Sequence, residues 1–117
     1  MLRTMCYAKI HGATVTRTEL HYEGSITIPA DLLRAADILP GERVQVVNLN
    51  SGSRLETYVI AGPEGSGEIC LNGPAARKGA VGDTIHILAY GLMDEEEART
   101  AALKTLHVDA HNRVIES

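Results

Sequence analysis

The most informative part of the sequence is residues 21–29, His21-Tyr22-Glu23-Gly24-Ser25-Ile26-Thr27-Ile28-Pro29. It predicts a strand over residues 25–28, which ends at Pro29 because proline donates no backbone hydrogen bond. Gly24 before the strand marks a turn, since glycine adopts backbone angles that other residues avoid. Short strands between glycine- or proline-centred turns recur along the chain. This spacing favours a small β-barrel or β-sandwich.

The remaining expected elements follow one another without a linker, repeat or low-complexity tract. They are strands at 43–49, 54–61, 68–71 and 84–92, two short strands within 106–115, and short helices at 31–38 and from residue 94. The sequence therefore predicts a mainly β protein that forms a single domain over residues 1–117.

The composition is that of a soluble globular protein. Hydrophobic residues make up 44% of the 117 residues, charged residues 22%, and the formal net charge is −4. An acidic balance gives no support for binding nucleic acid or an anionic membrane surface. The chain has no Trp or Phe, so we expect a core of Ile, Val and Leu, which favour strands.

Several functional classes find no support in the sequence. Cys6 and Cys70 are too few for a disulfide framework, have no metal-ligand spacing around them, and are interpreted as small apolar fillers. No metal site is predicted. The N-terminus lacks the apolar stretch of a signal peptide, and no run of residues approaches the length of a membrane-spanning helix. A cytoplasmic location is the expectation.

The Gly24-Ser25 dipeptide has a chemical meaning beyond a turn. A serine hydroxyl can attack the preceding carbonyl and convert the amide into an ester, and glycine is the least hindered acyl donor. Elimination across the ester leaves dehydroalanine, which hydrolyses to an N-terminal pyruvoyl group. By itself such a dipeptide more often marks an ordinary turn.

The predicted strand at 54–61 contains a second candidate cluster. Because side chains alternate along a strand, Arg54, Glu56 and Tyr58 share one face, whereas Thr57 lies on the other. Arg54 could hold a carboxylate and Tyr58 could supply a proton to one small acidic substrate. The alternative is ordinary cross-strand pairing on a solvated face.

These motifs occur together in an order that resembles the pyruvoyl-dependent aspartate 1-decarboxylases. The resemblance covers nearly the whole chain. It rests on residues 20–28 and on Met1-Leu2-Arg3-Thr4-Met5, Lys9-Ile10-His11, Ala13-Thr14-Val15-Thr16, Ala35-Ala36-Asp37-Ile38-Leu39, Gly52-Ser53-Arg54, Thr57-Tyr58-Val59-Ile60, Asn72-Gly73, Val81-Gly82-Asp83 and Met93-Asp94-Glu95-Glu96-Glu97-Ala98-Arg99.

The resemblance implies a fold, an activity and an assembly. The fold is a six-stranded double-psi β-barrel with short helices, and the assembly is a homotetramer. The activity is conversion of L-aspartate to β-alanine and CO₂ for pantothenate and coenzyme A synthesis. It proceeds through a Schiff base with a pyruvoyl group, the covalent cofactor made from Ser25 after cleavage into a β-chain of residues 1–24 and an α-chain of residues 25–117.

The resemblance also implies residue roles. Tyr58 would be the proton donor, and Thr57 would hydrogen-bond the Gly24 carbonyl during processing and later line the substrate site. The other substrate contacts and processing residues it implies are Lys9, His11, Tyr22, Arg54, Asn72, Gly73, Pro74 and Ala75.

Four positions depart from the family pattern: Gly12, Pro74, Arg77 and His86. They replace an Arg, an Ala, a His and an aliphatic residue of many members. None alters Gly24, Ser25, Thr57 or Tyr58. We therefore expect these departures to change the affinity for substrate rather than the type of reaction. His86 is interpreted as a satisfied or partly exposed strand histidine. Two alternatives remain: a non-catalytic barrel that serves as a binding or scaffold module, and a pyruvoyl decarboxylase with a shifted substrate preference.

Overall fold

The computed structural model describes residues 1–115. It contains eight strands, two α-helices and one 3₁₀ helix. In chain order they are β1 (Arg3–Thr14), β2 (Arg17–Glu19), β3 (Ser25–Pro29), α1 (Ala30–Ala36), β4 (Arg43–Asn48), β5 (Arg54–Gly62), β6 (Cys70–Asn72), η1 (Gly73–Arg77), β7 (Thr84–Met93), α2 (Glu95–Thr100) and β8 (Lys104–His107).

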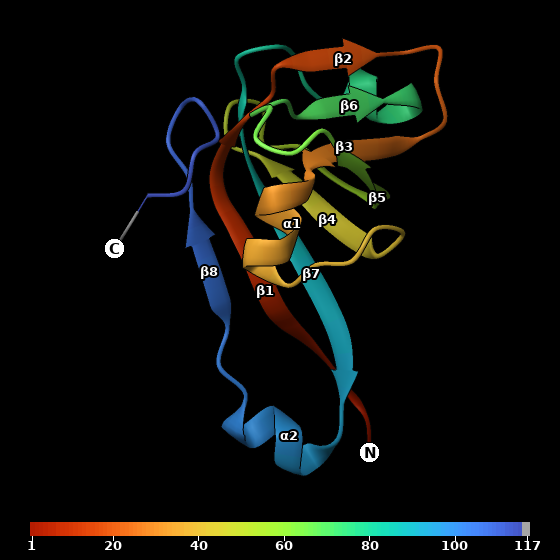
Figure 1. Ribbon diagram of the computed structural model, residues 1–117. Coiled ribbons are helices and arrows are strands. Elements are labelled where there is room, and N and C mark those ends of the chain that lie inside the picture. The colour runs from red at the N-terminus through yellow and green to blue at the C-terminus, as the bar shows by residue number, and fades with distance from the viewer. Residues whose placement is uncertain (116–117) are drawn as a thin grey trace.

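All eight strands join one sheet in the order β2-β6-β3-β5-β4-β7-β1-β8. β3 pairs with β5 in parallel and with β6 antiparallel, so it lies between two strands from distant parts of the sequence. Figure 1 shows β2, β6 and β3 stacked at one end of the molecule, while β1 and β7 form a long ribbon that leads to α2 at the other end.

The mainly β prediction is confirmed, but the closed six-stranded double-psi barrel is not. The sheet has eight strands, and β2 and β8 form its two edges, so the sheet of residues 1–115 is not closed. Its parallel pairs, β3 with β5, β2 with β6 and β1 with β8, nevertheless require long crossover connections rather than hairpins.

β1 is the longest strand, and the sequence analysis did not predict it. It pairs with β7 from Arg3 to Thr14, but the register shifts between Cys6 and Ala8 and again between Ile10 and Ala13. Each β-bulge inserts an extra residue and moves the following side chains to the opposite face. The alternation that identifies a strand in a sequence is therefore interrupted twice within β1.

The core lies between the curved sheet and α1. Its largest fully buried side chains are aliphatic, as expected for a chain without Trp or Phe: Ile10, Ile26, Ile28, Leu32, Ile69, Leu71, Ile85 and Ile87. Helix α1 buries Leu32, Leu33 and Ala36 and stops at Asp37, which adopts left-handed backbone angles. Helix α2 begins at a capping box in which Asp94 and Glu97 satisfy each other's backbone N–H groups.

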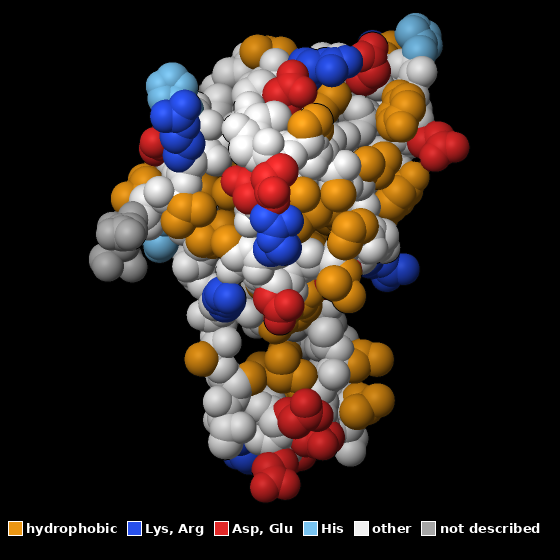
Figure 2. Space-filling view, in the orientation of Figure 1, with side chains coloured by type: hydrophobic (Ala, Val, Ile, Leu, Met, Phe, Trp, Pro, Cys, Tyr) orange, Lys and Arg blue, Asp and Glu red, His pale blue; other side chains and the backbone are white. Residues whose placement is uncertain are grey.

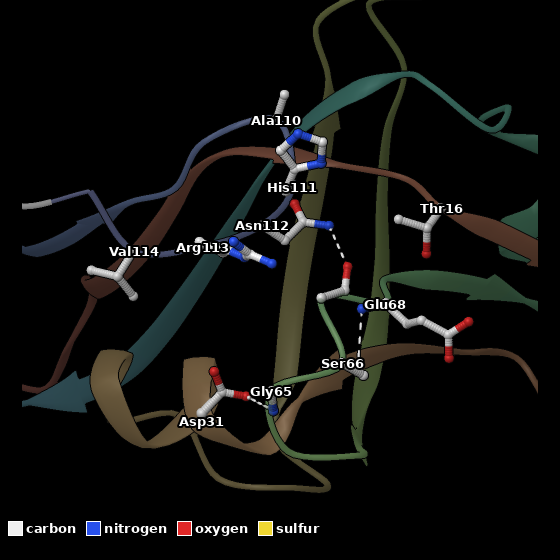
Figure 3. Close-up of a pocket in the computed structure, with 11 residues that line it drawn as sticks. Thr16, Asp31, Gly65, Ser66, Glu68, Ala110, His111, Asn112, Arg113 and Val114 are labelled. Atoms are coloured by element: carbon white, nitrogen blue, oxygen red, sulfur yellow. Dashed lines mark hydrogen bonds between the residues drawn. The ribbon is translucent and has the colours of Figure 1, made fainter.

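The side chain of Asn112 links the C-terminal turn to two other parts of the molecule. This residue is 3% exposed and has a backbone φ of 61°. Its Oδ1 accepts from the Thr14 N–H at 2.7 Å, and its Nδ2 donates to the carbonyl oxygens of Thr14 and Gly67 at 2.9 and 2.7 Å. Asn112 therefore joins β1, the loop before β6 and the C-terminal turn. Figure 3 shows its side chain pointing toward the loop before β6.

We predict that Asn112→Ala lowers the free energy of unfolding by about 3 kcal/mol. The substitution leaves buried backbone groups without hydrogen-bond partners, and it places alanine in the left-handed backbone conformation, which alanine disfavours. Chemical denaturation measures this change. The exposed neighbour His111 is the matched control, and His111→Ala should stay within about 0.5 kcal/mol of the unaltered protein. Equal stability of the two variants would contradict the role given to Asn112.

Candidate active site

The centre of the predicted site is Ser25, the first residue of β3. Its side chain is fully buried. Its Oγ donates to the Glu23 carbonyl oxygen at 3.0 Å and accepts from Asn72 Nδ2 at 3.0 Å. A hydrogen bond to the carbonyl two residues earlier directs the hydroxyl back along the backbone that contains Gly24. The hydroxyl predicted to attack the Gly24 carbonyl is thus held beside that peptide and away from solvent.

Asn72 lies directly opposite Ser25, because β3 and β6 pair with Ser25 facing Asn72. The Asn72 side chain is 3% exposed and also donates to Thr27 Oγ1 at 2.9 Å. Both of its amide hydrogens are therefore used inside the protein, one of them on Ser25.

Gly73 brings the next turn against the Gly24 backbone. It has a φ of 61°, and a Cβ atom built on it would lie 2.6 Å from the Tyr22 carbonyl oxygen and 2.8 Å from the Gly24 nitrogen. Such contacts are shorter than real side chains make, so only glycine permits the approach. Pro74 follows at the start of η1, where a backbone N–H has no helical partner, and its Cδ would lie 3.3 Å from a Cβ on Gly24.

A cleft of about 410 Å³ opens beside Gly24. Its lining includes several of the residues that the sequence singled out: Gly24, Thr57, Tyr58, Pro74 and Ala75. The parallel pairing of β3 with β5 explains this meeting, since Ile26 faces Val59 and so places the preceding residues of both strands side by side. The fold thus brings Tyr22, Gly24, Ser25, Thr57, Tyr58 and the 72–75 turn into one region.

Tyr58 extends from β5 toward the turn before Ser25. Its hydroxyl makes a long hydrogen bond, 3.4 Å, to Glu23 Oε2. Desolvation raises the pKa of Tyr58, and the Glu23 carboxylate and Tyr22 raise it further. The phenol therefore keeps its proton at neutral pH, as the predicted role of proton donor requires.

Lys9 and His11 lie elsewhere in the single chain. Both are on β1, on the face opposite its buried residues Ala8 and Ile10, and β1 is the fourth strand from β3 in the sheet order. Neither is among the residues that line the cleft beside Gly24. Burial, with the charges of Lys9 and His107, lowers the pKa of His11.

His11 belongs to a small histidine cluster. Its ring stacks on that of His86 with 4.0 Å between centroids and lies 5.0 Å from that of His107. His86 Nδ1 accepts from the backbone N–H of Gly12 at 3.0 Å, so His86 is the satisfied, half-buried strand histidine that was predicted. The two departures Gly12 and His86 thus form one contact, at the β1 bulge where Gly12 has a φ of 83°.

Arg54 shares the exposed face of β5 with Glu56 and Tyr58, as the alternation predicted. Its guanidinium donates to Gln45 Oε1 on β4 at 2.8 Å. This is the cross-strand contact that the sequence left as the alternative to carboxylate binding. Arg54 and Tyr58 do not contact a common partner among the hydrogen bonds of residues 1–115.

Sequence reasoning missed two neighbours of Asn72. Thr27 was read only as part of a strand, and Cys70 only as an apolar filler, yet both hydrogen-bond the Asn72 amide. The signal was present as strand alternation, because residues 25 and 27, like 70 and 72, share a face. What the sequence did not give was the pairing that puts these two faces together.

Another pocket, of about 510 Å³, lies between α1 and the C-terminal turn (Figure 3). Its lining residues include Asp31, Glu68, His111 and Arg113, and none of the predicted site residues is among them. Across residues 1–115, no group of three or more His, Cys, Asp or Glu side chains is arranged to hold a metal ion. Neither of the described α-helices has the length and apolar character needed to cross a membrane.

The chain is similar to known proteins of one family. The sequence profile of the family described as Aspartate decarboxylase matches residues 1–115. The aspartate 1-decarboxylase of Pelotomaculum thermopropionicum is 56% identical over 99% of this chain and 88% of its own length. Those of Moorella thermoacetica and Carboxydothermus hydrogenoformans are 56% and 55% identical, over 97% and 98% of this chain and 89% and 91% of their own lengths. This chain belongs to the aspartate decarboxylase family.

Proposed function

We propose that this protein decarboxylates L-aspartate to β-alanine and CO₂, using a pyruvoyl group that it makes from Ser25. The observation that carries the proposal is the buried Ser25 hydroxyl, held by Asn72 directly after Gly24 and next to a cleft that Tyr58 lines. β-Alanine formed in this way would supply pantothenate and coenzyme A synthesis.

Maturation would begin with attack of Ser25 Oγ on the Gly24 carbonyl carbon. The C–N bond breaks, the nitrogen of residue 25 takes up the hydroxyl proton, and an ester joins the two residues. Loss of the proton on Cα of residue 25 then expels the Gly24 carboxylate and leaves dehydroalanine. Water replaces the nitrogen, which departs as ammonia. The products are a β-chain of residues 1–24 and an α-chain of residues 25–117.

The surroundings of Ser25 fit such a group. Gly73 forms a backbone cradle against residues 22–24 that any Cβ atom would fill, and the adjoining cleft is lined by Gly24, the residue directly before Ser25. Asn72 Nδ2 points at the position where the group would stand. When present, the pyruvoyl group supplies an electron sink for the pair released as the carboxylate leaves.

The chain's own side chains supply proton transfer and substrate positioning. Tyr58 holds a proton on its hydroxyl at the edge of the cleft and would deliver it to the former α-carbon. Thr57, Asn72 and the Gly73-Pro74-Ala75 turn would orient aspartate. We assign Arg54, Lys9 and His11 to carboxylate binding, because guanidinium, ammonium and imidazole groups suit an acidic substrate.

We further propose that the chain forms a homotetramer in which neighbouring subunits complete each other's sites. Lys9 and His11 do not line the cleft of their own chain, so a second copy would have to bring them to it. Exposed apolar side chains support assembly: Met1, Leu2, Leu92 and Leu103 are 50–87% exposed. Figure 2 shows hydrophobic side chains at the surface of the narrow part of the molecule.

Other readings have less support. A non-catalytic binding or scaffold module is not favoured, because identity to aspartate 1-decarboxylases extends over nearly the whole chain. A shifted substrate preference has weaker grounds than the sequence suggested, since Pro74 lies in the first turn of η1 and His86 pairs with the Gly12 backbone. We also propose that the protein is located in the cytoplasm and that it adopts the double-psi barrel of the family.

We predict that Ser25→Ala gives an intact, inactive chain, because alanine has no hydroxyl to attack Gly24. Denaturing mass spectrometry should show one species near 12.6 kDa, whereas the unaltered protein yields two fragments. Ser53→Ala, at a second serine that follows a glycine, is the matched control and should still be cleaved after Gly24. Fragments from Ser25→Ala would overturn the proposed maturation.

Tyr58→Phe separates maturation from catalysis. This variant keeps the ring but removes the proton, so cleavage should proceed while kcat for β-alanine formation falls about 100-fold or more. Fragment yield and β-alanine, measured on the same sample, test both statements. Full turnover by the phenylalanine variant would remove Tyr58 from the reaction.

Mixed assemblies test the shared site. Lys9→Ala and Ser25→Ala subunits should each be inactive alone, but co-expression should restore about a quarter of the sites, because some clefts then meet an intact Lys9 on a neighbour. The control pairs Ser25→Ala with Tyr58→Phe. Tyr58 lines the same cleft as Gly24 within one chain, so this mixture should gain nothing. If the mixture of Lys9→Ala and Ser25→Ala subunits stays inactive, the site is not shared between subunits.

A further inference from the structure

Four polar side chains form a hydrogen-bonded cluster on one face of β3 and β6. Ser25 faces Asn72 and Thr27 faces Cys70 across the antiparallel pair. The intervening residues Ile26 and Leu71 point to the other side, where they belong to the apolar core. The cluster is therefore set by alternation on two paired strands, and it extends from the proposed cleavage site to residues without an assigned role.

The Asn72 amide lies at the centre of this cluster. Its Oδ1 accepts from Cys70 Sγ at 3.1 Å, and its Nδ2 donates to Ser25 Oγ at 3.0 Å and to Thr27 Oγ1 at 2.9 Å. Cys70 is 7% exposed and Asn72 is 3% exposed, so water cannot readily replace these partners. All three hydrogen-bonding sites that the amide presents to the cluster are satisfied.

The opposite orientation of the amide would satisfy fewer groups. Rotation by 180° would place Oδ1 against Ser25, whose single hydroxyl proton is already donated to the Glu23 carbonyl oxygen. It would also place the NH₂ group against sulfur, which is a weak acceptor. Ser25, whose proton is committed to Glu23, therefore favours the nitrogen end of the amide, while Cys70 donates to the oxygen end and Thr27 accepts from the nitrogen end.

We propose that Cys70 and Thr27 are positioning residues for self-cleavage, which hold the Asn72 amide with its nitrogen toward Ser25 Oγ. This inference rests on the proposed maturation at Gly24-Ser25. With the nitrogen in place, Ser25 accepts a hydrogen bond on one lone pair and keeps its own proton directed at the Glu23 carbonyl. Its side chain is then confined to one rotamer beside the peptide it attacks, which is the condition for an efficient intramolecular reaction.

Two matched pairs of variants test the proposal. Cys70→Ala and Cys70→Ser have similar volumes, but only serine retains a donor for Asn72 Oδ1. Thr27→Val replaces the hydroxyl by a methyl group, whereas Thr27→Ser removes the methyl group and retains the hydroxyl. The readout is the rate at which freshly synthesised precursor is converted to the two fragments, followed by denaturing mass spectrometry.

We expect cleavage to slow about tenfold in Cys70→Ala and Thr27→Val, and to stay within about threefold of the unaltered protein in both serine variants. Cys6→Ala is the control for loss of a thiol, since Cys6 Sγ contacts only the Ala8 carbonyl oxygen among the hydrogen bonds of residues 1–115, and it should cleave normally. Equal rates within either pair would overturn the role of that residue.

A double-mutant cycle separates positioning from packing. If Cys70 acts through the amide, Cys70→Ala should cause no further slowing when Asn72 is already alanine. Independent slowing in that background would show that Cys70 acts through packing and would overturn the inference. If the unaltered chain itself stays intact, the proposed function fails; if it cleaves but the variants match it, only the positioning role fails.

Discussion

The pairing of β3 with β6 is the constraint on which the rest of the site depends. It sets Ser25 opposite Asn72 on the polar side while Ile26 and Leu71 enter the core on the other side. A shift by one residue would exchange these faces and bury the wrong set of side chains. The parallel pairing with β5 then adds Thr57 and Tyr58, so one strand of five residues brings together side chains from three segments of the chain.

The parts of the fold that alternate regularly could be predicted from the sequence. The strands at 25–28, 43–49, 54–61 and 84–92 correspond to β3, β4, β5 and β7, and both helices were expected. β1 was not predicted because two bulges interrupt its alternation of buried and exposed residues. β2 was not predicted because a strand of three residues is too short to show such an alternation. Sheet order could not be read at all, since the crossover connections pair segments far apart in sequence.

The site was predicted in the same uneven way. Resemblance to a family predicted roles for Ser25, Tyr58 and Asn72, and the structure places these residues close to Gly24 and the 73–75 turn. Alternation correctly placed Arg54 and Tyr58 on one face, but sharing a face along a strand did not bring their tips to a common partner. Thr27 and Cys70 went unrecognised because their meaning lies in cross-strand contacts, which a single strand's pattern does not contain.

The proposed cleavage would cut a small domain near its N-terminus, and the topology explains how the fold would persist. Residues 1–24 contribute β1, which pairs with β7 over nearly its whole length and with β8 along its other side, and they also contribute β2, which pairs with β6. The apolar side chains of β1, such as Ile10, are in the shared core. Backbone pairing and core packing therefore hold the two pieces together without the Gly24–Ser25 bond. Cleavage of that one peptide bond would cost the fold little, because the turn contributes few packing contacts and the strands on both sides contribute most of them.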